Sequence, residues 1–235
     1  MSREENELKN KKESGIEAFK KNLPPQFVKR CIVLCLGLLI MALGVAFSIQ
    51  AGLGTSPISS LPYVLSIITP LTVGKTTICM HCVLILLQII ILRKRYQPFQ
   101  LLQLPVAIIF GYMTDLCVWI VERISYTCYW QQWILCVIGT ALVALGVSLE
   151  VLSRVVTLAG EGLVLAVCRV LPVKFGNMKI AFDVTLVVIA CVLSLIFLHN
   201  ISGVREGTVF AALLVGTFSK QMLKPMVKFE EKHLM

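Results

Sequence analysis

The chain has 235 residues, of which 57% are hydrophobic and 15% charged, and its mean hydropathy is +0.84. Soluble domains hold about a quarter charged residues, so this composition excludes an ordinary water-soluble fold and indicates an all-α polytopic membrane protein. The formal net charge of +9 is concentrated in the tails and short loops, which is typical of contact with anionic lipid headgroups and not of nucleic-acid binding.

The first segment, residues 1–26, is highly charged and lacks the apolar core of a signal peptide. We therefore expect a cytosolic tail that ends near Pro24 and Pro25, and a second cytosolic tail over residues 223–235. Most of the nine cysteines lie inside apolar runs, where a free thiol behaves as a small hydrophobic group. No disulfide framework is expected.

Six apolar segments between the tails are candidates to cross a membrane, which takes about 20 residues. They are residues 28–49, 76–93, 101–121, 131–150, 179–198 and 207–222. Two shorter apolar segments, 57–70 and 158–171, would each cover only about 20 Å as a helix, against a hydrocarbon core of about 30 Å. We expect these two to be short re-entrant or broken helices.

The basic residues choose between the two topologies. If only six helices cross, both tails, the stretch "RKRY" at 93–96 and the region around Arg154 lie on one side of the membrane. If the short segments crossed fully, "RKRY" would lie on the opposite side from the N-terminal tail. The positive-inside rule favours six spans with both termini in the cytoplasm.

The two halves of the chain resemble each other. "GLLIMALGV" at 37–45 resembles "GTALVALGV" at 139–147, and the same shift of 102 residues pairs Thr55 with Thr157 and Pro70 with Pro172 without gaps. Each half has three crossings, so the halves would lie in opposite orientations. This is the inverted-repeat plan of many secondary transporters, whose broken helices form the substrate site. The expected repeats are residues 27–126 and 127–222.

Specific stretches also resemble a known family. They are "AGLGTSPISSLPYVLS", "LTVGK" and "GVREGTVFAALLVG", and the chain resembles the YczE/YyaS/YitT-like bacterial integral membrane proteins over residues 28–222. The resemblance implies a multi-pass protein of the bacterial inner membrane, in a family largely without an assigned activity. It brings no cofactor and no catalytic residues to this chain.

The first broken segment has the features of a helix that starts inside the membrane. Thr55 or Ser56 is a natural N-cap and Pro57 suits the first helical position, while Gly52 and Gly54 permit backbone torsions that other residues avoid. If the residues before Pro57 run extended into the membrane, the helix presents free N–H groups at mid-depth. That place suits an anion, a carboxylate or a carbonyl.

The second broken segment carries its own negative charge, Glu161, beside Gly160 and after Thr157. A charge at mid-depth is costly, so it normally faces a partner or a watery cavity. We expect the two turns to approach each other and these residues, with those of the first turn, to line a cavity for a solute. The alternative is that both segments only pack the helices closely, with Glu161 capping its own helix.

Three further polar residues lie inside predicted spans. His81 and Asp183 are equivalent in the two repeats, and each lies about 9 Å along its helix. A histidine changes charge near physiological pH and an aspartate can pass a proton, so these two and Asp115 are candidates for proton coupling. The alternative for each is a hydrogen bond between helices.

Other polar groups favour structural roles. "CMHC" at 79–82 lacks the further ligands that a soft-metal site needs, so no metal is expected. Glu150 and Arg154 have the spacing of an ion pair within one helix. Arg205 and Glu206 are expected to pair with each other or with headgroups, with an entrance gate as the alternative.

No nucleotide-binding loop, serine elbow or zinc-protease motif occurs, so we expect no enzyme and no cofactor. We predict a secondary-transporter-like permease for a small polar or anionic solute. The alternatives are a non-transporting partner, assembly or sensor protein, and an intramembrane enzyme. A water-reachable cavity favours the permease, and a filled centre favours the partner. Solute, energy coupling and oligomeric state stay open.

Overall fold

The computed structural model describes residues 26–233, and these residues form helices joined by short connections. The helices are α2 (Phe27–Ala51), α3 (Pro57–Ile68), α4 (Val73–Leu92), η1 (Arg93–Arg95), η2 (Pro98–Leu102), α5 (Gln103–Val121), α6 (Tyr129–Ser153), α7 (Ala159–Val170), α8 (Phe175–Leu198) and α9 (Glu206–His233). The predicted tail over residues 1–26 lies outside the described residues, apart from Gln26. Helix α9 continues through most of the predicted second tail.

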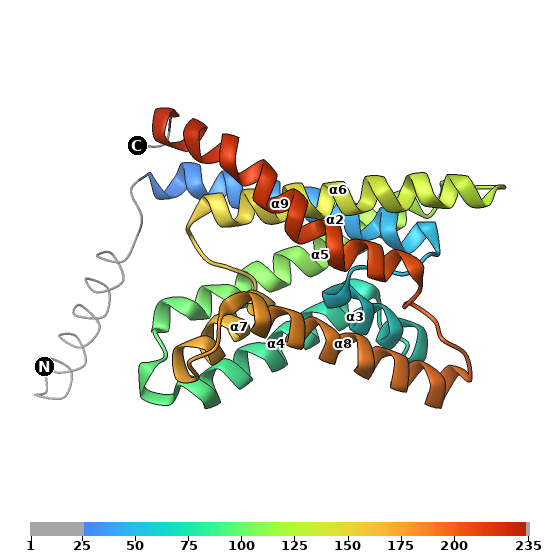
Figure 1. Cartoon of the computed structure of the whole chain (residues 1–235), viewed down its shortest axis with the longest axis horizontal. Helices are drawn as coiled ribbons and strands as arrows, with labels where there is room; N and C mark the ends of the chain where they lie inside the picture. The colour runs from blue at the N-terminus through green and yellow to red at the C-terminus, as the bar shows by residue number, and fades with distance from the viewer. Residues whose placement is uncertain (1–25, 234–235) are drawn as a thin grey trace, which may run out of the picture.

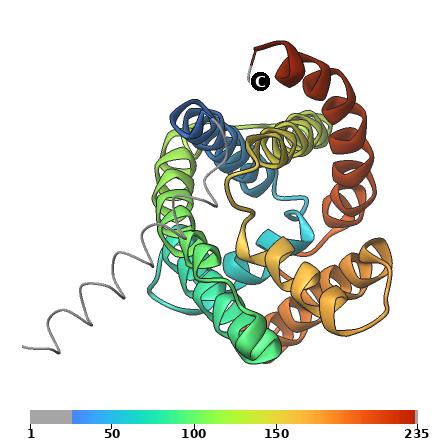
Figure 2. The ribbon, with the colours of Figure 1, turned by 90° about the vertical axis from the view of Figure 1, so that its left-hand side faces the viewer.

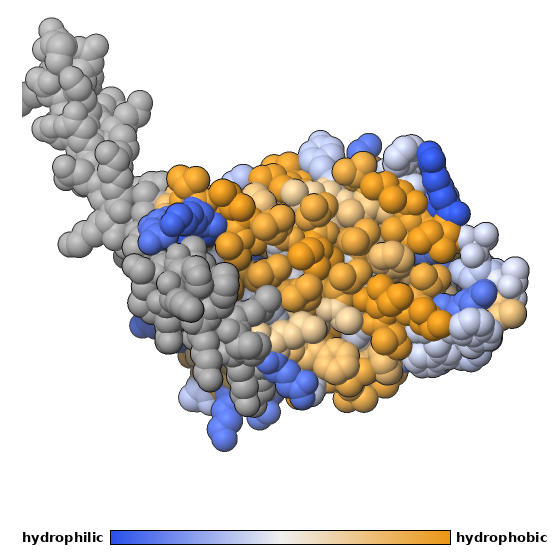
Figure 3. Space-filling view, turned by 90° about the horizontal axis from the view of Figure 1, so that it is seen from above, coloured by the Kyte–Doolittle hydropathy of each residue, from blue (hydrophilic) through white to orange (hydrophobic). Residues whose placement is uncertain are grey.

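Five helices, α2, α4, α5, α6 and α8, are long and apolar enough to cross a membrane, and they coincide with five of the six predicted spans. Helix α9 begins where the sixth was predicted, but its described apolar part, Glu206–Ser219, is shorter, so the sixth span stays a prediction. Apolar side chains cover the middle of the surface in Figure 3, and polar ones gather toward both ends. The protein is therefore a helical polytopic membrane protein.

Helices α2 and α6 cross closely at four glycines. A Cβ built on Gly44 would lie 2.7 Å from the carbonyl oxygen of Gly139, and one built on Gly146 would lie 2.7 Å from that of Gly37. Small residues let helix backbones approach in this way inside a membrane, where apolar burial adds little to association. Because Gly37 meets Gly146 while Gly44 meets Gly139, the two helices are antiparallel, as Figure 1 also shows.

The two short helices begin inside the bundle. Helix α2 ends at Gly52, whose φ of 67° allows the chain to turn inward, and α3 begins at the predicted N-cap Ser56 with Pro57 in the first position. In Figure 1, α3 returns to the end of the molecule where α2 ends, and α7 returns to the opposite end, where α6 ends. Figure 2 shows the long helices surrounding α3 and the segments that lead into the two short helices.

The helix contacts come in matching pairs. Helix α3 packs against α8, and α7 packs against α4; likewise α2 packs against α5, and α6 against α9. Two apolar clusters fill the interior, one centred on α2 and α5 and the other on α4, α7 and α8. The starts of α3 and α7 therefore lie in a packed setting contributed by both halves of the chain.

Candidate functional site

The tips of the two short helices meet in the centre of the bundle, as the sequence analysis expected. The Ile58 side chain at the start of α3 occupies the space where a Cβ on Gly160, at the start of α7, would lie. Phe182 of α8 closes the same point. A larger residue at position 160 would therefore displace the Ile58 side chain, and the contact between the tips is apolar.

The first connecting segment, residues 52–56, is buried from Leu53 onward, whereas Gly52 is exposed. Thr55 is 1% exposed; its N–H donates to the carbonyl oxygen of Gly203 at 3.2 Å, and its Oγ1 has no hydrogen-bond partner among the described residues. Gly54, with φ of 95°, lies against Thr208 and the backbone of Arg205. The hydroxyl of Ser56 donates to that of Ser59 at 3.1 Å.

The loop between α8 and α9 seals this segment from its own end of the molecule. The N–H of Gly207 donates to the carbonyl oxygen of Leu53 at 2.8 Å, and Nη1 of Arg205 donates to that of Gly52 at 3.1 Å. Arg205 also pairs with Glu206 at 3.3 Å, as predicted. Three of the predicted site residues of the first repeat, Gly54, Thr55 and Ser56, are thus enclosed under this loop, whereas the fourth, Gly52, is exposed.

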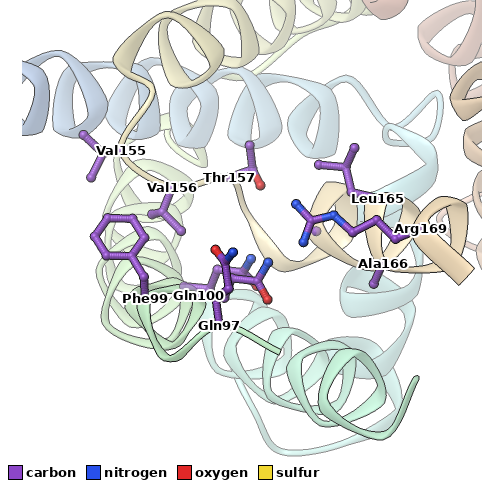
Figure 4. Close-up of a pocket in the computed structure, with 11 residues that line it drawn as sticks. Gln97, Phe99, Gln100, Val155, Val156, Thr157, Leu165, Ala166 and Arg169 are labelled. Carbon is purple, nitrogen blue, oxygen red and sulfur yellow. The ribbon is translucent and has the colours of Figure 1, made fainter. Parts of the chain in front are cut away.

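The second connecting segment, residues 154–158, adjoins two hollows. Thr157 lines a pocket of about 190 Å³ together with η2, the start of α5 and one face of α7. Its lining residues are Gln97, Phe99, Gln100, Gln103, Val155, Val156, Thr157, Gly162, Leu165, Ala166 and Arg169. Figure 4 shows the side chain of Arg169 reaching from α7 toward the glutamines, with Thr157 above them. A second hollow of about 230 Å³ lies beside Glu150 and Arg154.

A cluster of charged groups surrounds the start of α7. Glu150 is 2% exposed, and its Oε1 accepts the N–H of Leu158 at 2.6 Å, which holds the connecting segment. Lys179 pairs with Asp183 at 2.7 Å, and Glu161 interacts electrostatically with both. The structure therefore brings Glu161 and Asp183, two of the predicted site residues, into one cluster.

His81 lies apart from that cluster. It is 2% exposed, packs edge-on against Phe110 with ring centroids 6.2 Å apart, and its Nδ1 has no partner among the described residues. No hydrogen bond or ion pair joins it to Asp183 in the described part of the chain. The repeat-equivalent positions 81 and 183 thus have different surroundings.

Asp115 holds the start of α4. Its Oδ2 accepts the hydroxyl of Thr72 at 2.6 Å, and its Oδ1 accepts the N–H of Gly74 at 2.6 Å. A carboxylate that accepts these bonds stabilises a helix start through its free N–H groups and its dipole. This geometry is the interhelical hydrogen bond that the sequence analysis gave as the alternative to proton coupling.

We expect Asp115→Ala to lower the free energy of unfolding by about 1–2 kcal/mol, because the helix start loses its acceptor. Asp115→Asn keeps one acceptor oxygen and should lose less. The measurement is thermal unfolding in detergent, with Thr185→Ala as control, since that hydroxyl bonds only within its own helix. Equal midpoints for wild type and both Asp115 variants would contradict the capping role.

A buried pair of glutamines beside the pocket was not predicted from the sequence. Nε2 of Gln88 donates at 3.0 Å both to Oε1 of Gln103 and to the carbonyl oxygen of Ala159. A Cβ on Gly162 would lie 2.7 Å from Nε2 of Gln103 and 2.9 Å from Oε1 of Gln88, so a larger residue there would displace these amides. The signal in the sequence was Gln88 itself, an uncharged polar residue in the apolar run "VLILLQII".

Among the described residues, no group of three histidine, cysteine, aspartate or glutamate side chains lies close enough together to hold a metal ion. Within "CMHC", His81 is buried while Cys79 is exposed, so the two point to different surroundings. The described residues that could hold a ligand are the amides, hydroxyl and guanidinium of the pocket.

Comparisons with known proteins agree with the resemblance drawn from the sequence. The model of a family of unknown function, DUF6198, matches residues 28–224. The uncharacterized protein YyaS of Bacillus subtilis (strain 168) is 34% identical over 120 residues, which are 51% of this chain and 58% of YyaS. The predicted resemblance to YyaS-like proteins is thus confirmed, and the match spans little more than half the length of that relative. No solved structure matches the chain.

Proposed function

We propose that this chain, which belongs to the DUF6198 family of unknown function, is a secondary-transporter-like permease for a small polar or anionic solute. In this proposal six helices cross the bacterial inner membrane, α3 and α7 are re-entrant, and both termini face the cytoplasm. The partners are the anionic lipid bilayer and the solute, and the chain is not an enzyme.

The observation that carries the proposal is the reciprocity of the contacts between the two halves. At a shift of 102 residues, Gly37 is equivalent to Gly139, and Gly44 is equivalent to Gly146. Replacing each glycine by its equivalent therefore converts one glycine contact of the α2–α6 crossing into the other. The paired contacts of α3 with α8 and of α7 with α4 exchange in the same way. Because α2 and α6 are antiparallel, this pattern supports two repeats of opposite orientation.

The contact between the short helices supports the same relation. Ile58 and Gly160 are themselves 102 residues apart, and they touch. Equivalent positions touch each other only near a symmetry axis, so the tips of α3 and α7 lie close to it. Transporters built from inverted repeats place their broken helices at this point, near the middle of the bilayer.

The segments that lead into the two short helices differ in how well they are covered, although exact symmetry would make them alike. Residues 52–56 are sealed by the loop before α9, whereas residues 154–158 adjoin an open pocket. A carrier that is open to one side has this asymmetry. Arg93, Arg95 and Arg169 lie at the pocket end, so the positive-inside rule turns that opening toward the cytoplasm.

In this proposal the charged cluster beside α7 couples transport to protons. Glu161 and Asp183 interact with one another and with Lys179 beside the start of α7, where a proton or the cation could balance them. His81 and Asp115 lie outside this cluster, and Asp115 already caps α4.

One observation favours the second candidate, a partner, assembly or sensor protein that does not transport. The contact of Ile58 with Gly160 and Phe182 fills the point between the two helix tips with apolar atoms. A protein that never opens would keep this centre closed, whereas a carrier must part it or route the solute beside it.

A labelling experiment separates the two candidates. Single cysteines replace Thr157 and Thr55 in a background without native cysteines, and a membrane-impermeant thiol reagent is added to either side of sealed vesicles. A permease predicts labelling of Thr157→Cys from the cytoplasmic side and slower labelling of Thr55→Cys from the other side. Thr140→Cys, at a threonine buried within α6, is the inert control. If Thr55→Cys is as inert as this control, the permease is contradicted.

A further inference from the structure

We propose that the pocket beside α7 binds a small monocarboxylate that also carries a hydrogen-bond donor, with Arg169 holding the carboxylate. This inference rests on the proposed permease and names the class of its solute. The pocket is built from three elements that are far apart in the sequence: η2 with the start of α5, the segment before α7, and α7 itself.

Among the described lining residues, one carries a formal charge. It is Arg169, and no acidic side chain in the described part of the chain pairs with it. An unpaired guanidinium facing a pocket in a membrane protein attracts an anion, and its planar fork of donors matches a carboxylate. One positive charge balances a monoanion, whereas a dianion would leave a charge without a partner.

The amides define what the rest of the solute needs. Gln103 is 2% exposed and lines the pocket. Nε2 of Gln88 donates both to Oε1 of Gln103 and to the carbonyl oxygen of Ala159. Because both acceptors are oxygens, the orientation of the Gln88 amide is fixed, and Nε2 of Gln103 remains as a donor. The pocket therefore presents a positioned amide donor beside the guanidinium.

An acceptor in the lining lacks a partner. Oε1 of Gln100 is buried and receives no hydrogen bond from a described residue. Leaving a buried acceptor unsatisfied is unfavourable, so a hydroxyl or N–H group of the solute would gain a bond there. Gln97 and the hydroxyl of Thr157 add further polar contacts on either side (Figure 4).

The size of the pocket limits the solute. Its 190 Å³ corresponds to about six water molecules at their share of liquid volume. A carboxylate with two or three further carbon atoms and one hydroxyl fits that space. Charge, hydrogen bonding and volume thus agree on a small hydroxy-substituted monocarboxylate.

The test uses the labelling of Thr157→Cys as a reporter of occupancy. Lactate, glycerate and acetate are added to vesicles before the thiol reagent, each beside its neutral amide and beside the dianion succinate. Lactate or glycerate near ten times its dissociation constant should slow labelling about tenfold, by mass action. Acetate should protect less, and the amides and succinate should not protect.

Matched variants assign the effect to the pocket. Arg169→Gln should abolish protection while Thr157→Cys is still labelled without solute, and Lys174→Gln, a cation at the same end that does not line the pocket, should keep it. If Thr157→Cys is labelled but no monocarboxylate protects it, or protection survives Arg169→Gln, this inference is overturned and the permease stands. If Thr157→Cys is never labelled, the permease itself fails.

Discussion

Replacing Gly44 by alanine is expected to lower the free energy of unfolding by about 1–3 kcal/mol, the usual cost of overpacking a tight interface. The added Cβ would lie 2.6 Å from the backbone nitrogen of Val143 and 2.7 Å from the carbonyl oxygen of Gly139. Both are main-chain atoms, so α2 and α6 must separate. Gly146→Ala should destabilise similarly, because its Cβ would meet Gly37 and Met41 in the equivalent place.

The control for these variants is a helical glycine with open space. A Cβ on Gly176 or Gly216 meets nothing within 4 Å. Alanine is favoured over glycine in a helix by about 1 kcal/mol, so Gly216→Ala should be neutral or stabilising. Thermal unfolding in detergent measures all three variants. A Gly44→Ala protein as stable as Gly216→Ala would remove the close crossing on which the repeat arrangement depends.

The second large effect is expected at the seal over residues 52–56. Gly203 has φ of 78°, its carbonyl accepts the N–H of Thr55, and a Cβ there would lie 2.9 Å from side-chain atoms of Tyr63 and Val64. A β-branched residue in the left-handed region is unfavourable by about 1–2 kcal/mol. Gly203→Val should therefore shift the population toward a state in which the loop has left Thr55.

Such a shift changes accessibility at both ends. Because about 1.4 kcal/mol is a tenfold change in an equilibrium, labelling of Thr55→Cys from the loop's side should rise about tenfold in Gly203→Val. In a carrier the opening of one end closes the other, so labelling of Thr157→Cys from the cytoplasmic side should fall. The same pair of cysteines in a Gly216→Val background is the control.

The direction of the second change is decisive. A protein that is only loosened by Gly203→Val would label faster at both positions, and Thr140→Cys would also begin to react. Faster labelling at Thr55→Cys with unchanged or faster labelling at Thr157→Cys would contradict alternating access.

The helices could be predicted from the sequence because length and hydropathy are local properties. The N-cap Ser56 with Pro57, and the short lengths of α3 and α7, followed from the same local signals. The approach of the two helix starts followed from the repeat. The apolar character of this contact could not be predicted, because it depends on the Ile58 side chain occupying the space beside Gly160.

The polar contacts were harder to predict because they join residues far apart in the chain. Gln88 and Gln103 lie on different helices and meet only at the start of α7. Asp115 was read as a buried titratable group, yet it caps a helix whose start is 41 residues earlier in the chain. Glu161 and Asp183 were both predicted as site residues from the sequence, but Lys179, which interacts with both, was not.

The most direct test of two oppositely oriented repeats is the side of the membrane on which the turn after each short helix lies. Single cysteines at Ser125 and Val173, both exposed, flank α6 and α7. If α6 crosses and α7 returns to the side from which it started, the impermeant reagent labels Ser125→Cys and Val173→Cys from opposite sides. Gln26→Cys and Leu71→Cys should likewise differ, since α2 crosses and α3 returns. Labelling of both members of either pair from the same side would contradict the arrangement.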